Sequence, residues 1–157
     1  MSNKELIHRF YTAFSEGNSK EMVACYHDDI TFQDPVFGQL QGQRAKAMWL
    51  MLLSKKNSKS TITFDGVEVD DTRGKATWVA EYYYGDKKRK VVNRVSASFK
   101  FQDGKIIEHT DIFDLWLWTK QAMGFVGYLI GWSSLLKNKI QKTTNSNLYQ
   151  FMNNTSL

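Results

Sequence analysis

Apolar residues follow a helical spacing in the first third of the chain and a strand spacing in the middle. Segments 3–16, 19–26 and 42–56 place apolar side chains three and four residues apart, which predicts three helices. Segment 29–34 instead alternates apolar and polar residues, which predicts a short strand. Pro35 ends that strand because proline lacks the backbone N–H that a strand interior needs.

From residue 60 onward the period of the pattern changes from 3.6 to 2. Four alternating segments, separated by turns rich in Gly and Asp, predict an antiparallel meander at residues 60–71, 75–84, 87–102 and 105–116. Helices gathered on one face of an antiparallel sheet define the α+β class. A long twisted sheet curls, so we expect a conical barrel around the N-terminal helices, with a small-molecule pocket at its mouth.

The last part of the chain, residues 119–157, is expected to form a C-terminal helical extension of a domain made by residues 1–118. Glycines at positions 124, 127 and 131 predict broken short helices in place of one long helix. Many apolar side chains lie near these glycines, and a covering surface is needed to remove them from water.

We expect the extension to pack over the pocket mouth or against a second copy of the chain. Lysines 137, 139 and 142 follow the apolar stretch and raise a membrane surface as the less favoured alternative. Residues 143–157 are polar, with several Asn and Thr, and we expect them to fray.

The chain contains 21 basic and 16 acidic residues, a net charge of +5. The densest basic cluster, residues 85–90, is expected to be a solvated hairpin tip, and the scattered charge does not favour nucleic acid as a partner. No apolar run is long enough to span a bilayer and no leader pattern opens the chain, so we expect a cytoplasmic protein.

Cys25 is the one cysteine, and its place on an apolar helix face predicts a buried structural thiol. The three histidines and this cysteine lack the spacing of metal ligands, so no metal is expected. The sequence also lacks a glycine-rich phosphate loop, so we expect no nucleotide cofactor.

Four polar residues share the apolar side of their strands and are expected to face the interior: Asp34, Asn93, His109 and Asp111. A carboxylate in an apolar cone loses hydration, which raises its pKa and makes it a workable acid or base near neutral pH. Two such carboxyls can divide the roles, one ionised and one protonated, with His109 as a third proton carrier or an orienting group.

Each of these residues also has a purely structural interpretation. Asp34 stands before a proline and is suited to capping a turn. His109 is a candidate core histidine, and Asp111 is a candidate partner for Arg94 or a lysine. The last strand carries apolar residues on both sides, so the alternation alone leaves its facing close to ambiguous.

Two stretches resemble a known family: "FYTAFSEGNSKEMVACYHDDITFQDPVFGQLQGQRAKAMW" and "FKFQDGKIIEHTDIFDLW". They are similar to the SnoaL-like polyketide cyclase and ketosteroid isomerase group of the nuclear-transport-factor-like superfamily. The resemblance covers roughly residues 5–118. It implies a conical α+β barrel, a homodimer, a deep apolar pocket and no cofactor.

The resemblance also implies roles for two acids. The isomerases use an Asp before a Pro as the base, which falls on Asp34, whereas the cyclases and limonene-epoxide hydrolases use an Asp on the last strand, which falls on Asp111. The isomerases' oxyanion tyrosine falls on Phe10, and their protonated Asp falls near Ala97, so this chain departs from that pattern at both donors. Tyr11 lies one step from the tyrosine position.

Together these observations predict an enzyme that performs cofactor-free proton transfer on an apolar carbonyl or epoxide compound. Asp34 is the expected base, Asp111 with His109 the expected acid, and Asn93 a positioning donor. The residues expected to line the pocket are Phe10, Tyr11, Phe32, Trp49, Phe99 and Phe113. The alternatives are a non-catalytic binding domain for an apolar metabolite and a protein-interaction module.

Overall fold

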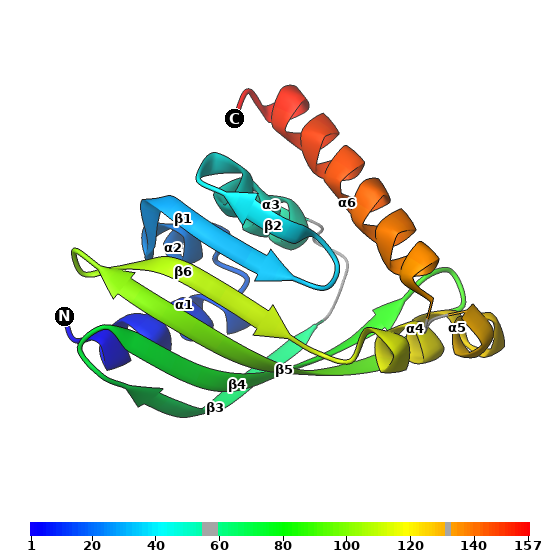
Figure 1. The fold of residues 1–157 in the computed structure, drawn as a ribbon, viewed down its shortest axis with the longest axis horizontal. Helices are drawn as coiled ribbons and strands as arrows, with labels where there is room; N and C mark the ends of the chain where they lie inside the picture. Colours follow the sequence, from blue (N-terminus) through cyan, green and yellow to red (C-terminus); the bar gives the residue numbers. More distant parts are fainter. Residues whose placement is uncertain (55–59, 131–132) are drawn as a thin grey trace.

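The computed structural model describes residues 1–54, 60–130 and 133–157, which form one six-stranded curved sheet with flanking helices (Figure 1). In chain order the elements are α1 (Asn3–Ser15), α2 (Ser19–Ala24), β1 (Tyr26–Asp34), β2 (Gly38–Gln41), α3 (Gln43–Ser54), β3 (Thr61–Val69), β4 (Arg73–Tyr84), β5 (Arg89–Gln102), β6 (Lys105–Ile112), α4 (Leu115–Met123), α5 (Phe125–Ile130) and α6 (Ser134–Thr155).

The strand order is β2-β1-β6-β5-β4-β3, with β2 and β3 at the two edges. Neighbouring strands are antiparallel except β1 and β6, which run parallel. The predicted α+β class and meander are confirmed, but the last strand ends at Ile112 and not at residue 116, and the sheet stays open without closing into a barrel. β2 was not predicted because four residues are too few for a period to show.

The boundary between α2 and β1 differs from the sequence prediction. The predicted helix over 19–26 ends at Ala24, and β1 begins at Tyr26, where it pairs with Ile106 of β6. Pairing across the sheet thus overrides the local helical spacing of Tyr26. Residues 55 and 56 of the third predicted helix lie outside the described residues.

The helix α1 supplies much of the core on the concave side of the sheet. Ser2 caps it with a capping box: the Ser2 hydroxyl accepts from the Glu5 N–H, and the Ser2 N–H donates to the Glu5 carboxylate at 2.7 Å. The buried face of α1 consists of Leu6, Ile7, Phe10, Tyr11, Ala13 and Phe14. Ile7 and Phe101 approach Gly74 so closely that a Cβ there would meet both at 3.0 Å.

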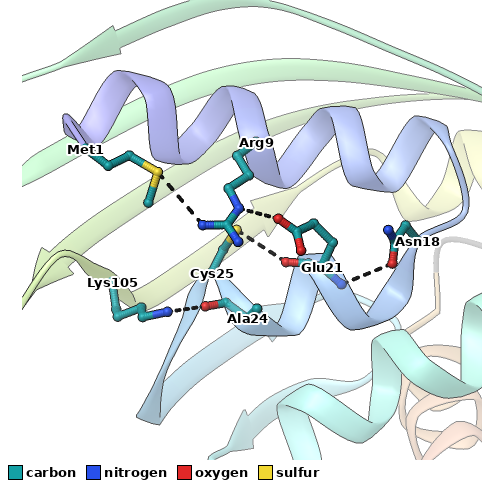
Figure 2. Close-up of polar contacts among 7 residues, drawn as sticks. All are labelled: Met1, Arg9, Asn18, Glu21, Ala24, Cys25 and Lys105. Carbon is teal, nitrogen blue, oxygen red and sulfur yellow. Dashed lines mark hydrogen bonds and ion pairs between the residues drawn. The ribbon is translucent and has the colours of Figure 1, made fainter.

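Polar contacts fasten α1, α2 and the start of β6 at one corner (Figure 2). Arg9 of α1 pairs with Glu21 of α2, and Lys105 donates to the Ala24 carbonyl. Cys25 is fully buried, and its thiol donates to the Glu21 carbonyl at 3.4 Å. Burial raises the pKa of this thiol, so it stays protonated, and the prediction of a buried structural thiol is confirmed.

A β-bulge settles which side of β6 faces inward. The pairing of β5 with β6 shifts register between Lys100 and Phe101, so one residue of β6 is skipped. Ile106 is consequently buried in place of Ile107, which the uninterrupted alternation had put inside. Beyond the bulge His109 and Asp111 face inward, as predicted.

The C-terminal segment begins with two short helices, but the break predicted at Gly127 is wrong, because α5 runs through this residue. Gly124 separates α4 from α5 and has a φ of 67°, in the left-handed region that favours glycine. The third predicted break, Gly131, lies outside the described residues. Figure 1 shows α4 and α5 at the end of the molecule opposite the N-terminus.

The predicted fraying of residues 143–157 is wrong, because α6 continues to Thr155. Its polar residues are satisfied by the β1–β2 turn: Thr144 donates to the Val36 carbonyl at 2.9 Å and Asn145 to the Phe37 carbonyl at 2.8 Å. Leu148 is fully buried against the main core. Polar residues such as Thr144 and Asn145, which are typical of loops, therefore bind this long helix to the β1–β2 turn.

Candidate functional site

A pocket of about 680 Å³ lies between the concave sheet face, α3 and the C-terminal helices. Its wall is largely aromatic and aliphatic, with contributions from Phe32, Trp49, Trp78, Phe113 and Trp118. α6 closes one side of this pocket with Leu136, Lys139, Ile140, Thr143, Thr144 and Asn147. This size and lining suit a small apolar molecule held by a few polar groups.

The polar groups in this wall include Asp34, Asn93 and Asp111. A smaller hollow of about 330 Å³ on the β3–β4 turn, around Asp70 and Arg73, contains none of these three residues. The larger pocket is therefore the candidate site, because it alone of the two combines an apolar wall with the half-buried Asp34 and the buried Asp111.

Asp34 both caps a turn and lines the pocket. Its Oδ1 accepts the backbone N–H groups of Val36 at 2.9 Å and Phe37 at 2.6 Å, which fixes the carboxyl group at the end of β1. Burial raises the pKa of Asp34 to about 6, the negative charge of Asp111 adds to the rise, and the two N–H bonds oppose it. Asp34 therefore caps the turn, as its place before a proline suggested, and also faces the pocket, as its side of the strand suggested.

Asp111 is buried, and its Oδ1 takes part in two side-chain contacts. His109 Nε2 lies 3.0 Å away, and Trp78 donates its indole N–H at 3.2 Å. Within the described residues Asp111 has no ion pair with a lysine or with Arg94, which is exposed on the other face. No hydrogen-bond partner is present for Oδ2 in the described part of the chain, so this oxygen is available on the pocket side.

His109 is held from its other side by Tyr26. The Tyr26 hydroxyl lies 2.7 Å from His109 Nδ1 and accepts the Trp49 indole N–H at 2.8 Å. Burial raises the pKa of Tyr26 well above its ordinary value, so the hydroxyl keeps its proton. All bonds are satisfied when Tyr26 donates to Nδ1 and His109 carries its proton on Nε2, toward Asp111.

The parallel register of β1 and β6 brings the two acids together. Phe32 pairs with His109, and Gln33 pairs with Thr110. Asp34 and Asp111 are the next residues of the two strands. They lie close enough that the negative charge of Asp111 adds to the burial that raises the pKa of Asp34. The geometry thus forms a pair of carboxyl groups, each with Oδ1 bonded to the protein.

The structure divides the predicted pocket residues into two groups. Phe32, Trp49, Asn93 and Phe113 line the pocket with the two acids. Phe10, Tyr11, Phe99 and His109 are buried in the core and are not part of the pocket wall. His109 therefore contacts the site through Asp111. Its ring stacks on the Trp49 ring, with 6.3 Å between the two ring centroids.

Sequence reasoning missed Tyr26, Trp78 and the pocket wall supplied by α6. Trp78 lies in a correctly predicted strand, and its alternation with Ala76 and Ala80 could have identified it as inward-facing. Tyr26 gave no such signal because its spacing fits the preceding helix. The Tyr11 hydroxyl, fully buried, has no hydrogen-bond partner within the described residues.

Solved structures share this fold at low identity. An NTF2-like protein of unknown function from Burkholderia pseudomallei has a TM-score of 0.60 at 15% identity, covering 73% of this chain and 92% of its own. A candidate polyketide cyclase from Xanthomonas campestris has a TM-score of 0.60 at 22% identity, covering 75% of this chain and 94% of its own. An LEH-like epoxide hydrolase from M. tuberculosis has a TM-score of 0.63 at 17% identity, covering 80% of this chain and 93% of its own. These structures define the chain as an NTF2-like α+β fold.

The family is narrower than this fold. The family model of the SnoaL-like domain matches residues 7–109, which is well over half of the chain. The chain therefore belongs to the SnoaL-like domain family, which confirms the resemblance found in the sequence. No curated protein is similar enough in sequence to be matched.

The described residues also limit what a metal site or a membrane span could be built from. Within the described ranges, no cluster of three or more His, Cys, Asp or Glu side chains could hold a metal ion. Among the same residues, none of the helices combines the length and apolar character needed to cross a membrane.

Proposed function

We propose that this protein is an enzyme that transfers protons on an apolar carbonyl or epoxide compound without a cofactor. The observation that carries the proposal is the pair of carboxyls, Asp34 and Asp111, in the wall of one apolar pocket. The reaction is an isomerisation, a cyclisation or an epoxide hydrolysis, since each needs one base and one acid on opposite ends of a small substrate.

Asp34 is the proposed general base. Its pKa of about 6 makes it a stronger base than an ordinary Asp while leaving it mostly ionised at pH 7. The N–H groups of Val36 and Phe37 hold Oδ1, which leaves Oδ2 to take a proton from carbon or from a water molecule.

Asp111 is the proposed acid or hydrogen-bond donor. In the acid form, Asp111 carries its proton on Oδ2. Its Oδ1 then still accepts from Trp78 and His109, and Oδ2 donates to the substrate oxygen. Asp111 pairs across the sheet with Ala97, where the isomerase pattern has its protonated acid. A carboxyl from the neighbouring strand thus supplies the donor that Ala97 lacks.

The proposal is tested by proton exchange and ring opening on a panel of small apolar compounds. A panel of apolar ketones, lactones and epoxides is incubated with the protein in deuterated water, and deuterium uptake or ring opening is followed by mass spectrometry. Asp34→Asn and Asp111→Asn are each expected to lower the rate about 10²–10⁴-fold.

Asp29→Asn, at an exposed acid of the same strand, is the matched control and should retain the full rate. Binding of panel compounds in the pocket without turnover, and with affinity unchanged in Asp34→Asn, would instead identify a non-catalytic binding domain.

A further inference from the structure

Large apolar side chains are exposed at the end of the molecule where α4, α5 and the start of α6 meet. Leu135 is 80% exposed, Phe125 75% and Val126 55%. Trp116 and Tyr128 lie beside them, with the Lys120 ammonium over both rings at 5.8 and 5.5 Å. An exposed cluster of apolar side chains of this kind marks a surface that binds a protein or a membrane.

The same end carries the whole net charge of the chain. We call it the basic end and define it as residues 81–90, 114–129 and 133–142. It contains eight basic and three acidic residues, a net of +5, and the rest of the chain has 13 of each sign. The scattered charge of the sequence is thus gathered by the fold.

The hairpin tip between β4 and β5 is brought to α4 by specific contacts. Arg89 donates to the Gln121 carbonyl at 3.0 Å, and the Val92 N–H donates to the Gln121 side chain at 2.7 Å. Figure 1 shows this tip next to α4, α5 and the beginning of α6. Lys87 and Lys88 therefore share one end of the molecule with Lys137, although they are distant in sequence.

We propose that the basic end docks on the surface of an anionic lipid bilayer. The exposed side chains of Phe125 and Leu135 enter the boundary between lipid headgroups and acyl chains, while the lysines contact the lipid phosphates. Aromatic residues with a polar edge, such as Trp116 and Tyr128, favour this boundary. Self-association through the same face is disfavoured, because it would place a charge of +5 against an equal charge.

The basic end adjoins the pocket. Trp118 and Met123 of α4, and Leu136 and Lys139 of α6, line the pocket, while neighbouring residues of the same helices belong to the exposed surface. Docking would therefore bring the pocket close to the bilayer, where apolar compounds concentrate. This inference goes beyond the proposed function and does not depend on the two acids.

The test is vesicle flotation of the full chain with phosphatidylcholine alone and with phosphatidylcholine containing phosphatidylglycerol. We expect binding to the anionic vesicles only, and its loss when ionic strength rises from about 0.1 M to about 1 M, where the Debye length falls to ~3 Å. Lys87→Glu with Lys137→Glu should weaken binding at least tenfold, since each lysine contributes about 1 kcal/mol near an anionic surface.

The matched charge control is Lys4→Glu with Lys20→Glu, which makes the same change in net charge on the exposed surface of α1 and α2 and should bind nearly as wild type. Phe125→Ser with Leu135→Ser should also abolish flotation. Its control, Tyr149→Ser with Leu157→Ser, alters exposed apolar residues at the far end of α6, roughly 20 Å away.

Flotation that is absent, or equal for the patch and control variants, would overturn the proposal. A native mass that falls by half in Phe125→Ser with Leu135→Ser, measured by light scattering, would assign the surface to a second copy instead. Circular dichroism of each variant confirms that its fold is retained. Loss of turnover in Asp34→Asn leaves flotation unchanged, so the two proposals fail separately.

Discussion

Asp34, the last residue of β1, and Asp111, the residue before the end of β6, occupy matching positions on two parallel strands, one residue beyond the paired Gln33 and Thr110. Both side chains line the same pocket, and each has one oxygen bonded to the protein. Burial raises the pKa of Asp34 to about 6 and the negative charge of Asp111 adds to the rise, so the two carboxyl groups interact electrostatically.

The pKa of Asp34 predicts a pH-dependent stability. Between the ordinary value of 3.8 and about 6, the folded protein holds a proton that the unfolded chain has lost. The contribution of Asp34 to the free energy of unfolding should therefore fall as pH rises through this window and stay constant on either side of it. This contribution is on the order of 3 kcal/mol, measured as the change in the difference between wild type and Asp34→Asn in urea unfolding at pH 3.5 and pH 7.5.

Asp34→Asn should remove this pH dependence and unfold at higher urea than wild type at pH 7.5, because the amide oxygen still accepts from Val36 and Phe37. Asp34→Ala loses both bonds and should be less stable than Asp34→Asn by about 1–2 kcal/mol. An Asp34→Asn protein that keeps the wild-type pH profile would contradict the raised pKa.

Tyr26 is predicted to hold the His109 ring in place through Nδ1. Tyr26→Phe leaves the Trp49 N–H and His109 Nδ1 without their partner, so it should cost about 1–3 kcal/mol of stability. Because Asp111 still accepts from Nε2, the ring should keep its tautomer, and the ¹⁵N chemical shift of Nδ1 should change as this nitrogen loses its hydrogen-bond donor. Tyr83→Phe, at an exposed tyrosine, should change neither the stability nor the ring shifts.

Helix α6 is predicted to be a stable part of the domain, in contrast to what its sequence suggests. Leu148→Ala should lower the free energy of unfolding by about 2–5 kcal/mol, since Leu148 is fully buried, whereas Tyr149→Ala at the exposed neighbour should have little effect. Hydrogen exchange should show protected amides across residues 138–152. Rapid exchange throughout this stretch would contradict the packing of α6.

Filling the pocket should prevent ligand binding without disturbing the acids. Ala80 lines the pocket, and Ala80→Phe places a ring in the cavity. We expect weaker binding of an apolar fluorescent dye, measured by titration. The control is Val79→Phe, which points to the opposite face of the same strand and should leave dye binding unchanged.

The sequence by itself determined the elements and their class. The change from helical to alternating period located α1, α3 and the four strands of the meander, because a half-buried sheet requires strict alternation. It also pointed to Asp34 and Asp111, since a carboxyl on the apolar side of a strand needs an explanation beyond solubility. Gly124 likewise marked the break between α4 and α5.

The tertiary structure alone decided how these parts meet. The bulge in β6 exchanges Ile107 for Ile106 in the core, and such a shift leaves no trace in the alternation. Tyr26 and His109, far apart in the chain, form a bond that depends on the register of β1 and β6. Pairing of distant strands is set by packing energy summed over the whole sheet, and local spacing carries no record of it.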